Sequence, residues 1–195
     1  MISRKSRILG ISGSPRRGGN TDTLLDEMLR GAKSAGAICQ KIALKDIDFK
    51  GCVSCGSCSD VARICKIADG MRPIFKKIQE ADSLVVASPI YFGSITGQLK
   101  TMIDRFECFW AARCIFNKPM RTKSGSRGVF ICVAGQNKKI YFTNAKQIIK
   151  YFFNTIDMVY YDELLLTGIV DKADVLKRSG AMKKAFSMGV KLVRA

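Results

Sequence analysis

The chain has 195 residues, of which 47% are hydrophobic and 25% are charged, and its formal net charge at pH 7 is +17. This length and composition are typical of one compact domain with a full-sized core. The sequence contains no histidine, which excludes Ser-His-Asp catalysis, Cys-His catalysis and every histidine-ligated metal site, and favours redox or Lewis-acid chemistry.

A short basic segment opens the chain and leads into an apolar run over residues 7–11, which we interpret as the first strand. The run is too short for a signal peptide, and no stretch of the sequence approaches the length of a membrane span. No long linker or internal repeat divides the chain. We therefore expect one cytoplasmic domain over residues 1–195, without a membrane partner.

The next segment is a loop rich in hydroxyl groups, residues 12–21, followed by apolar residues at helical spacing with Asn20 or Thr21 as the N-cap. The loop has the glycine spacing of a P-loop but lacks its lysine, and a G-x-G-x-x-G dinucleotide motif is absent. Its hydroxyl groups, Arg16 and the free N–H groups of a helix start can still hold one phosphate. A mononucleotide, or another compound with one phosphate, fits this loop better than a nucleoside triphosphate.

Four cysteines follow the second predicted strand with the spacing C-x2-C-x2-C-x6-C, namely Cys52, Cys55, Cys58 and Cys65. Three thiols at successive x2 spacings in a Gly/Ser-rich turn can face a single centre, as in the loops that hold one face of a 4Fe-4S cluster. The more distant Cys65 can close such a site. The spacing therefore favours an iron-sulfur cluster.

Three other interpretations of these cysteines remain open. Zinc with four thiolate ligands usually takes two C-x2-C pairs with a longer spacer between them. Disulfides need an oxidising compartment. Reduced cysteines also pack as small apolar groups, which is what we expect for those outside the motif: Cys39, Cys108, Cys114 and Cys132.

The remaining segments alternate between strand and helix. The predicted strands are residues 7–11, 37–44, 83–87, 129–133 and 161–169. The predicted helices after the first one are residues 71–80, 99–109, 145–158 and 175–193. This alternation predicts an α/β fold with a parallel sheet covered by helices on both faces. In such sheets ligands bind beyond the carboxyl ends of the strands, so the loops after strands one, three and four are the expected binding rim.

Acidic residues are absent between Cys108 and Ile156, and a second basic segment begins at Lys177. A basic field of this size attracts nucleic acid, an acidic protein or a phosphorylated small molecule, unless it is merely a solvated surface. Nucleic acid is disfavoured because the basic residues are spread over several elements, without an aromatic RNA-binding motif or a zinc-finger pattern.

Two motifs flank the cysteines. The first reads Gly-Ile-Ser-Gly-Ser-Pro-Arg from residue 10, with Gly-Asn-Thr at 19–21, and the second reads Ser-Pro-Ile-Tyr-Phe-Gly-Ser from residue 88, with Ile-Asp-Arg at 103–105. Together they resemble the NADPH-dependent FMN reductase group, and with the cysteines the chain resembles the iron-sulfur flavoproteins. The resemblance implies a flavodoxin-like, doubly wound five-stranded parallel sheet of order 2-1-3-4-5, with a cysteine-rich cluster-binding loop, residues 51–66, after strand 2.

The same resemblance implies two cofactors, FMN and a 4Fe-4S cluster. The cluster ligands would be Cys52, Cys55, Cys58 and Cys65. The expected FMN-binding residues come from the three loops of the binding rim: Ser12, Ser14, Pro15, Arg16, Asn20, Thr21, Pro89, Ile90, Tyr91, Phe92, Gly93, Ala134, Gly135 and Gln136. Tyr91 and Phe92 offer ring faces to a flat ligand, with ordinary core packing as the alternative.

The function implied by the resemblance is that of a flavin-dependent oxidoreductase for electron transfer. Electrons would pass from an acidic donor such as ferredoxin, which suits the basic surface, through the cluster to FMN. A small-molecule acceptor such as oxygen, hydrogen peroxide or a quinone would then receive them. A homodimer or homotetramer is also implied, because the family places the cluster near the flavin of a neighbouring subunit. The alternative is an NAD(P)H-dependent FMN or quinone reductase whose cysteines are structural or bind zinc.

Overall fold

The protein is described by a computed structural model that covers residues 4–60, 65–121 and 123–194. Its centre is a five-stranded parallel sheet of order β2-β1-β3-β4-β5. The strands are β1 (Arg7–Ser12), β2 (Ile38–Ala43), β3 (Ser83–Pro89), β4 (Arg127–Val133) and β5 (Val159–Leu166). The predicted fold class and strand order are therefore confirmed.

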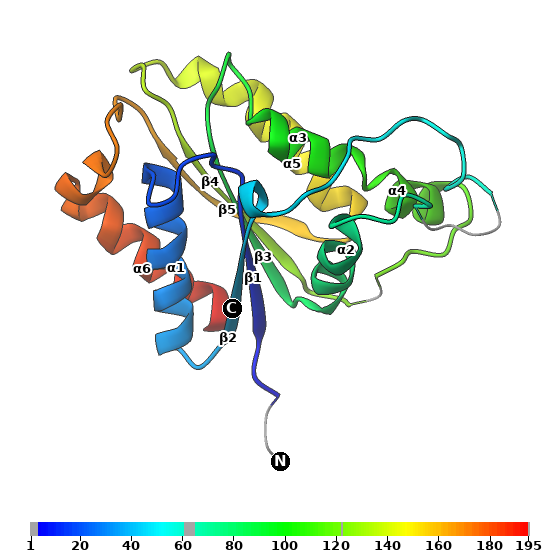
Figure 1. The fold of residues 1–195 in the computed structure, drawn as a ribbon. Helices are drawn as coiled ribbons and strands as arrows, with labels where there is room; N and C mark the ends of the chain where they lie inside the picture. The colour runs from blue at the N-terminus through cyan, green and yellow to red at the C-terminus, as the bar shows by residue number, and fades with distance from the viewer. Residues whose placement is uncertain (1–3, 61–64, 122, 195) are drawn as a thin grey trace.

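Helices cover both faces of the sheet (Figure 1). One face carries α1 (Asn20–Ser34) and α6 (Ser179–Arg194), and the other carries α2 (Met71–Glu80), α3 (Gly97–Asp104), α4 (Glu107–Cys114) and α5 (Phe142–Thr155). The described residues also form three short 3-10 helices: η1 (Leu44–Asp46), η2 (Lys139–Tyr141) and η3 (Asp174–Lys177). Within the described residues, no helix has both the length and the apolarity needed to cross a bilayer.

The alternation of side chains along β3 builds the core on both sides of the sheet. Leu84 and Val86 pack in the cluster beneath α2 to α5, whereas Val85 and Ala87 pack in the cluster beneath α1 and α6. The strands β1, β3 and β4 are almost continuously buried, and the edge strands β2 and β5 are partly exposed. Continuous apolar burial in the central strands is what a parallel sheet covered on two faces requires.

The sequence predictions were wrong at two helices. The predicted helix over 99–109 is interrupted between α3 and α4, where the Arg105 side chain turns into the protein and pairs with Asp69. Apolar spacing continues across this break, so the periodicity could not reveal it. The last helix begins at Ser179 because residues 174–177 form η3 as a separate turn.

Glycine allows α1 and α6 to pack with their backbones in close contact. A Cβ atom placed on Gly31 would lie 2.1 Å from the carbonyl oxygen of Phe186, and one placed on Gly189 would lie 2.0 Å from the carbonyl oxygen of Met28. Neither backbone oxygen can move away without shifting a helix. This contact sets the distance between α1 and α6, the two helices that cover one face of the sheet.

Gly31→Ala should lower the free energy of unfolding by roughly 1–3 kcal/mol, because the added methyl group overpacks the α1–α6 contact. Gly180→Ala is the matched control in α6, since a Cβ atom there meets nothing within 4 Å; it should leave the stability unchanged or raise it by about 0.5–1 kcal/mol. Urea unfolding followed by circular dichroism measures both. Equal stabilities for Gly31→Ala and the wild type would contradict the described packing.

Candidate functional site

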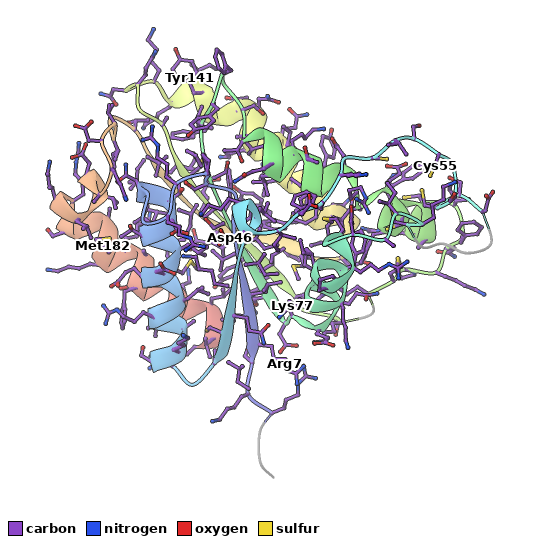
Figure 2. All side chains as sticks on the ribbon, in the orientation of Figure 1. Arg7, Asp46, Cys55, Lys77, Tyr141 and Met182 are labelled. Atoms are coloured by element: carbon purple, nitrogen blue, oxygen red, sulfur yellow. The ribbon has the colours of Figure 1, made fainter. Side chains whose placement is uncertain are left out.

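Two adjoining cavities lie at the carboxyl ends of β1, β3 and β4. This end of the strands, called the sheet edge below, is the one near Tyr141 in Figure 2. The first cavity has a volume of about 210 Å³ and is lined by the loop between β1 and α1, by the start of α1 and by the segments at the ends of β3, β4 and β5. The second, of about 570 Å³, lies between the loops after β3 and β4. Ile90, Tyr91 and Gly135 line both cavities, so the two form one extended site at the expected position.

The backbone of Gly13 fixes the start of the first loop. Its N–H donates to the carbonyl oxygen of Ala87 at 2.7 Å, which continues the pairing of β1 with β3. Its carbonyl oxygen accepts from Thr96 Oγ1 and Gln98 Nε2, both at 2.7 Å. A Cβ atom at Gly13 would lie 3.0 Å from Leu99 Cβ. The loops after β1 and β3 are therefore joined as one rigid rim.

A buried carboxylate shapes the other end of the loop. Asp22, in the first turn of α1, accepts from the Gly18 N–H at 3.0 Å and lies 2.7 Å from Lys41 Nζ on β2. Burial raises the pKa of Asp22, but Lys41, the Gly18 N–H and Ser12 together lower it by more than burial raises it. The pKa of Asp22 therefore lies below its usual value. The carboxylate stays ionised and is neutralised by Lys41, and it holds Gly18 in its left-handed conformation at φ 61°.

The N-terminus of α1 fits a phosphate group. Gly19 is its N-cap residue and brings no side chain to cap the first N–H groups, which lack partners within any α-helix. A Cβ atom on Gly19 would lie 3.2 Å from the carbonyl oxygen of Arg16 and 3.3 Å from Ser14 Oγ. Free N–H groups at a helix start, together with hydroxyl groups and cations, bind phosphate. The cavity wall supplies those groups from Ser14, Arg16, Thr21 and Lys172.

Asn20 has a different role from the predicted one. The prediction that Asn20 or Thr21 caps the helix was wrong, because Gly19 occupies that position. The Asn20 side chain donates to the carbonyl oxygen of Asp171 at 2.8 Å and accepts from the Val175 N–H at 3.1 Å. These bonds hold the segment after β5 against the first loop and bring Lys172 to the cavity wall.

Lys172 is the functional candidate that the sequence did not reveal. Asn20 and Asp171 are 151 positions apart, so no local motif connects Lys172 with the first loop. Ile169 and Val170, from the same segment, line the first cavity as well, and Tyr141 lines the second. The position of β5 beside β4 and the hydrogen bonds of Asn20 bring residues 169–172 to the site, whereas Tyr141 lies in η2 directly after β4.

The loop after β3 displays its aromatic residues outward. Tyr91 and Ser94 exchange backbone hydrogen bonds of 2.9 and 3.0 Å across a tight turn. Phe92 and Gly93 have φ values of 50° and 72°, the consecutive left-handed conformations of a type I′ turn. The side chains of Tyr91 and Phe92 are exposed, so core packing is wrong for both. A bulky residue with positive φ is strained, and such strain concentrates at functional positions.

Most of the residues predicted to bind FMN gather at the two cavities. Ser12 and Pro15 do not line either one, since Ser12 is buried beneath the loop near Asp22. The predicted residues that line one or both cavities are Ser14, Arg16, Asn20, Thr21, Pro89, Ile90, Tyr91, Phe92, Gly93, Ala134, Gly135 and Gln136.

The predicted metal ligands line a separate cavity of about 620 Å³ over α3, α4 and α5. Cys52, Cys55, Cys58 and Cys65 all contribute to its wall, and so does Cys108 of α4. Figure 2 shows Cys55 on a different side of the molecule from Tyr141. Among the described side chains, no three Cys, Asp or Glu residues stand close enough together to form a metal site. The ligand assignment therefore stays a prediction, supported by the shared cavity.

The thiols of this cavity differ in environment. Cys52 and Cys55 are exposed, Cys58 and Cys65 are half-buried, and Cys108 is fully buried. The Ser57 backbone N–H and hydroxyl lower the pKa of Cys55, whereas burial raises the pKa of Cys58 and raises that of Cys108 to about 11. Thiolates are the form that binds metal, so the exposed end of the segment is the more reactive one.

Comparison with known proteins agrees with this geometry. A family model described as NADPH-dependent FMN reductase matches residues 6–163. The chain belongs to this family. An iron-sulfur flavoprotein of Methanocaldococcus jannaschii is 39% identical over 99 residues, which are 51% of this chain and 51% of that protein. The match thus spans about half the length of such relatives.

Two further similarities cover more of the chain. A putative NAD(P)H-dependent FMN-containing oxidoreductase of Bacillus subtilis is 26% identical over 185 residues, 92% of this chain and 94% of that protein. The solved structure of a flavone reductase superposes with a TM-score of 0.75 at 21% identity, covering 97% of this chain and 62% of that one; it shows a common fold. The predicted membership of the FMN reductase group is confirmed, and iron-sulfur flavoproteins are among the relatives that this chain resembles in sequence.

Arg16→Ala should weaken FMN binding in this FMN reductase family member by about 1.5–3 kcal/mol, because a charge-assisted contact to the phosphate is lost. Lys172→Ala should weaken it by about 1 kcal/mol, since this cation is exposed and screened by water. Lys177→Ala is the control, an exposed lysine paired with Asp174 at 2.8 Å. Fluorescence titration of apoprotein with FMN gives the affinities. Wild-type affinity in Arg16→Ala would remove the phosphate assignment.

Proposed function

We propose that this chain is an electron-transfer flavoprotein that holds FMN at the sheet edge and a 4Fe-4S cluster on Cys52, Cys55, Cys58 and Cys65. The observation that carries the proposal is that all four thiols of the compact motif line one cavity in a chain of the FMN reductase family. Electrons would come from a ferredoxin-like donor and leave to oxygen, hydrogen peroxide or a quinone. When bound, the cluster supplies single-electron transfer and FMN supplies exchange between one-electron and two-electron steps.

The residues at the sheet edge would bind FMN in two parts. Arg16, Lys172 and the α1 N-terminus would hold the phosphate, because they present positive charge and N–H donors to the smaller cavity. Tyr91, Phe92 and the backbone around Gly135 would border the flat ring system in the larger cavity. The hydrogen bonds to Gly13 fix both loops in advance, so binding needs little rearrangement.

The backbone of the cysteine segment makes the sharp turns that a compact thiolate site needs. Ser54 and Gly56 have φ values of 51° and 74°, which turn the chain sharply between Cys52 and Cys58. Soft thiolate ligands suit an iron-sulfur cluster or zinc, and the x2 spacings favour the cluster. Cys58 and Cys65 pack against the core while Cys52 and Cys55 face outward, so the segment is anchored on its inner side.

The positions of the two sites support an oligomer. Among the described residues, none lines both the thiol cavity and a cavity at the sheet edge, and the two sites face different sides of the molecule (Figure 2). Electron transfer between the cofactors is therefore best served by a neighbouring subunit that places its thiol segment beside the exposed Tyr91 and Phe92. A homodimer or homotetramer would provide this arrangement.

The second candidate function is an NAD(P)H-dependent FMN or quinone reductase whose cysteines are structural or bind zinc. It is favoured by the Bacillus subtilis relative, which matches this chain almost from end to end. The two functions differ in the metal bound and in the electron donor. Fast flavin reduction by NADPH that does not depend on the cysteines would favour this second function.

Metal and flavin analysis of protein purified without air tests the proposal. We expect about four irons and four sulfides per chain beside one FMN. Cys58→Ser should remove the iron and keep the FMN, because the two sites share no wall. Cys39→Ser, a half-buried thiol on β2, is the control and should keep both. One zinc per chain, or FMN without metal, would contradict the proposal and favour the second candidate function.

The rate of reduction by ferredoxin should fall as the salt concentration rises. The Debye length shortens from about 30 Å at 0.01 M to about 8 Å at 0.15 M ionic strength, and a net charge of +17 attracts an acidic donor over such distances. Stopped-flow absorbance of the flavin measures this rate, with a small uncharged reductant as the control. A rate that is independent of ionic strength would remove the acidic donor from the proposal.

A further inference from the structure

Arg105, between α3 and α4, is a buried charged residue that the flavin site does not use. Its side chain has no solvent exposure. Its guanidinium donates to Asp69 at 2.7 and 3.2 Å, to the carbonyl oxygen of Lys50 at 2.7 Å and to that of Ile67 at 3.3 Å. A buried arginine is retained only with such compensation.

The partners of Arg105 lie at both ends of the cysteine segment. Lys50 precedes Cys52 and Ile67 follows Cys65, and one guanidinium binds the carbonyl groups of both. Asp69 strengthens this connection, because it accepts from the Lys50 N–H at 2.9 Å and from the Met71 N–H at 3.0 Å. The segment that carries the four thiols is thus closed at its base by one ion pair.

The guanidinium also faces the thiols. Arg105 lines the thiol cavity, whereas Asp69 does not. The guanidinium of arginine is always charged in proteins, so this buried side chain brings a fixed positive charge to the cavity wall. Its Nε–H is buried and has no hydrogen-bond partner among the described residues. A buried, unpaired donor is costly, and here it belongs to a residue in the wall of a proposed anionic site.

We propose that Arg105 is the positioning residue of the thiol site: it closes the cysteine segment into a loop and sets the reduction potential of the cluster bound there. This inference rests on the proposed function. The potential of an iron-sulfur cluster depends on its net charge, on hydrogen bonds to its sulfur atoms and on solvent exposure. A bound cluster would gain one negative charge on one-electron reduction, and the fixed guanidinium of Arg105 with its free N–H donor would stabilise that charge.

The test is a redox titration of the purified holoprotein with dithionite as the one-electron reductant, followed by electron paramagnetic resonance of the reduced cluster. Arg105→Gln should favour the oxidised cluster at least tenfold, a fall in midpoint potential of about 59 mV. Arg105→Lys keeps the charge and loses the forked donor geometry, so its potential should fall less. Iron and FMN content of every variant is measured alongside, which gives a readout independent of activity.

Arg121→Gln is a matched control. Arg121 is also buried, also binds backbone carbonyl groups, and also has an Nε–H without a partner among the described residues, but it does not line the thiol cavity. It should lower stability and leave the cluster potential at the wild-type value. The control distinguishes an effect that depends on the position of Arg105 beside the thiols from the general effect of removing a buried arginine.

Each outcome decides the inference. A lowered potential, or loss of iron with FMN retained, in Arg105→Gln and not in Arg121→Gln would support it. Wild-type potential and iron content in Arg105→Gln would overturn it, and so would loss of iron and FMN together in both Arg105 variants, because Arg105 would then only support the fold. Wild-type protein without an iron-sulfur cluster would instead show that the proposed function itself has failed.

Discussion

The peptide group of Gly13 connects the sheet to the site. Its N–H extends the hydrogen-bonding pattern of β1 with β3 by one residue, and its carbonyl oxygen accepts from Thr96, the N-cap residue of α3, and from Gln98 in the first turn of that helix. A parallel sheet brings its carboxyl ends to one edge, but it does not by itself fix the loops that follow. Here three hydrogen bonds to one glycine join the loop after β1 to the segment after β3, and these two segments carry Arg16, Tyr91 and Phe92.

The negative charge of Asp22 at this rim is neutralised by a neighbouring lysine. The local charge at the rim therefore cannot be inferred from the net charge of the chain. A carboxylate in an anion-binding loop would repel phosphate, yet Asp22 lies in the first turn of α1. Lys41 neutralises it at 2.7 Å, and the helix N-terminus also favours a negative side chain there. Asp22 can therefore hold the loop in shape through Gly18, while Arg16 and Lys172 line the cavity and are not paired with it.

The sequence predicted the fold well because its signals are local. Buried strands separated by helical spacing give the strand order once the family resemblance is added, and the loops after β1, β3 and β4 contain most of the residues at the cavities. Lys172 could not be predicted, because its place depends on the bonds that Asn20 makes to a distant segment. Ser12 and Pro15 belong to the same sequence motif as Ser14 and Arg16 but line neither cavity, and the motif alone does not distinguish the two pairs.

The break between α3 and α4 shows how a tertiary contact overrides a local pattern. Apolar residues continue at helical spacing through Phe106 and Phe109, and both are buried as expected. The chain nevertheless leaves the helix at Arg105, because a buried guanidinium needs partners and finds them in Asp69 and two carbonyl groups. A loop that only connects two elements lies on the surface and needs no such anchor. The segment between Lys50 and Ile67, which contains four thiols, is instead held at both ends by this buried arginine. The path of that segment is therefore fixed from within the protein.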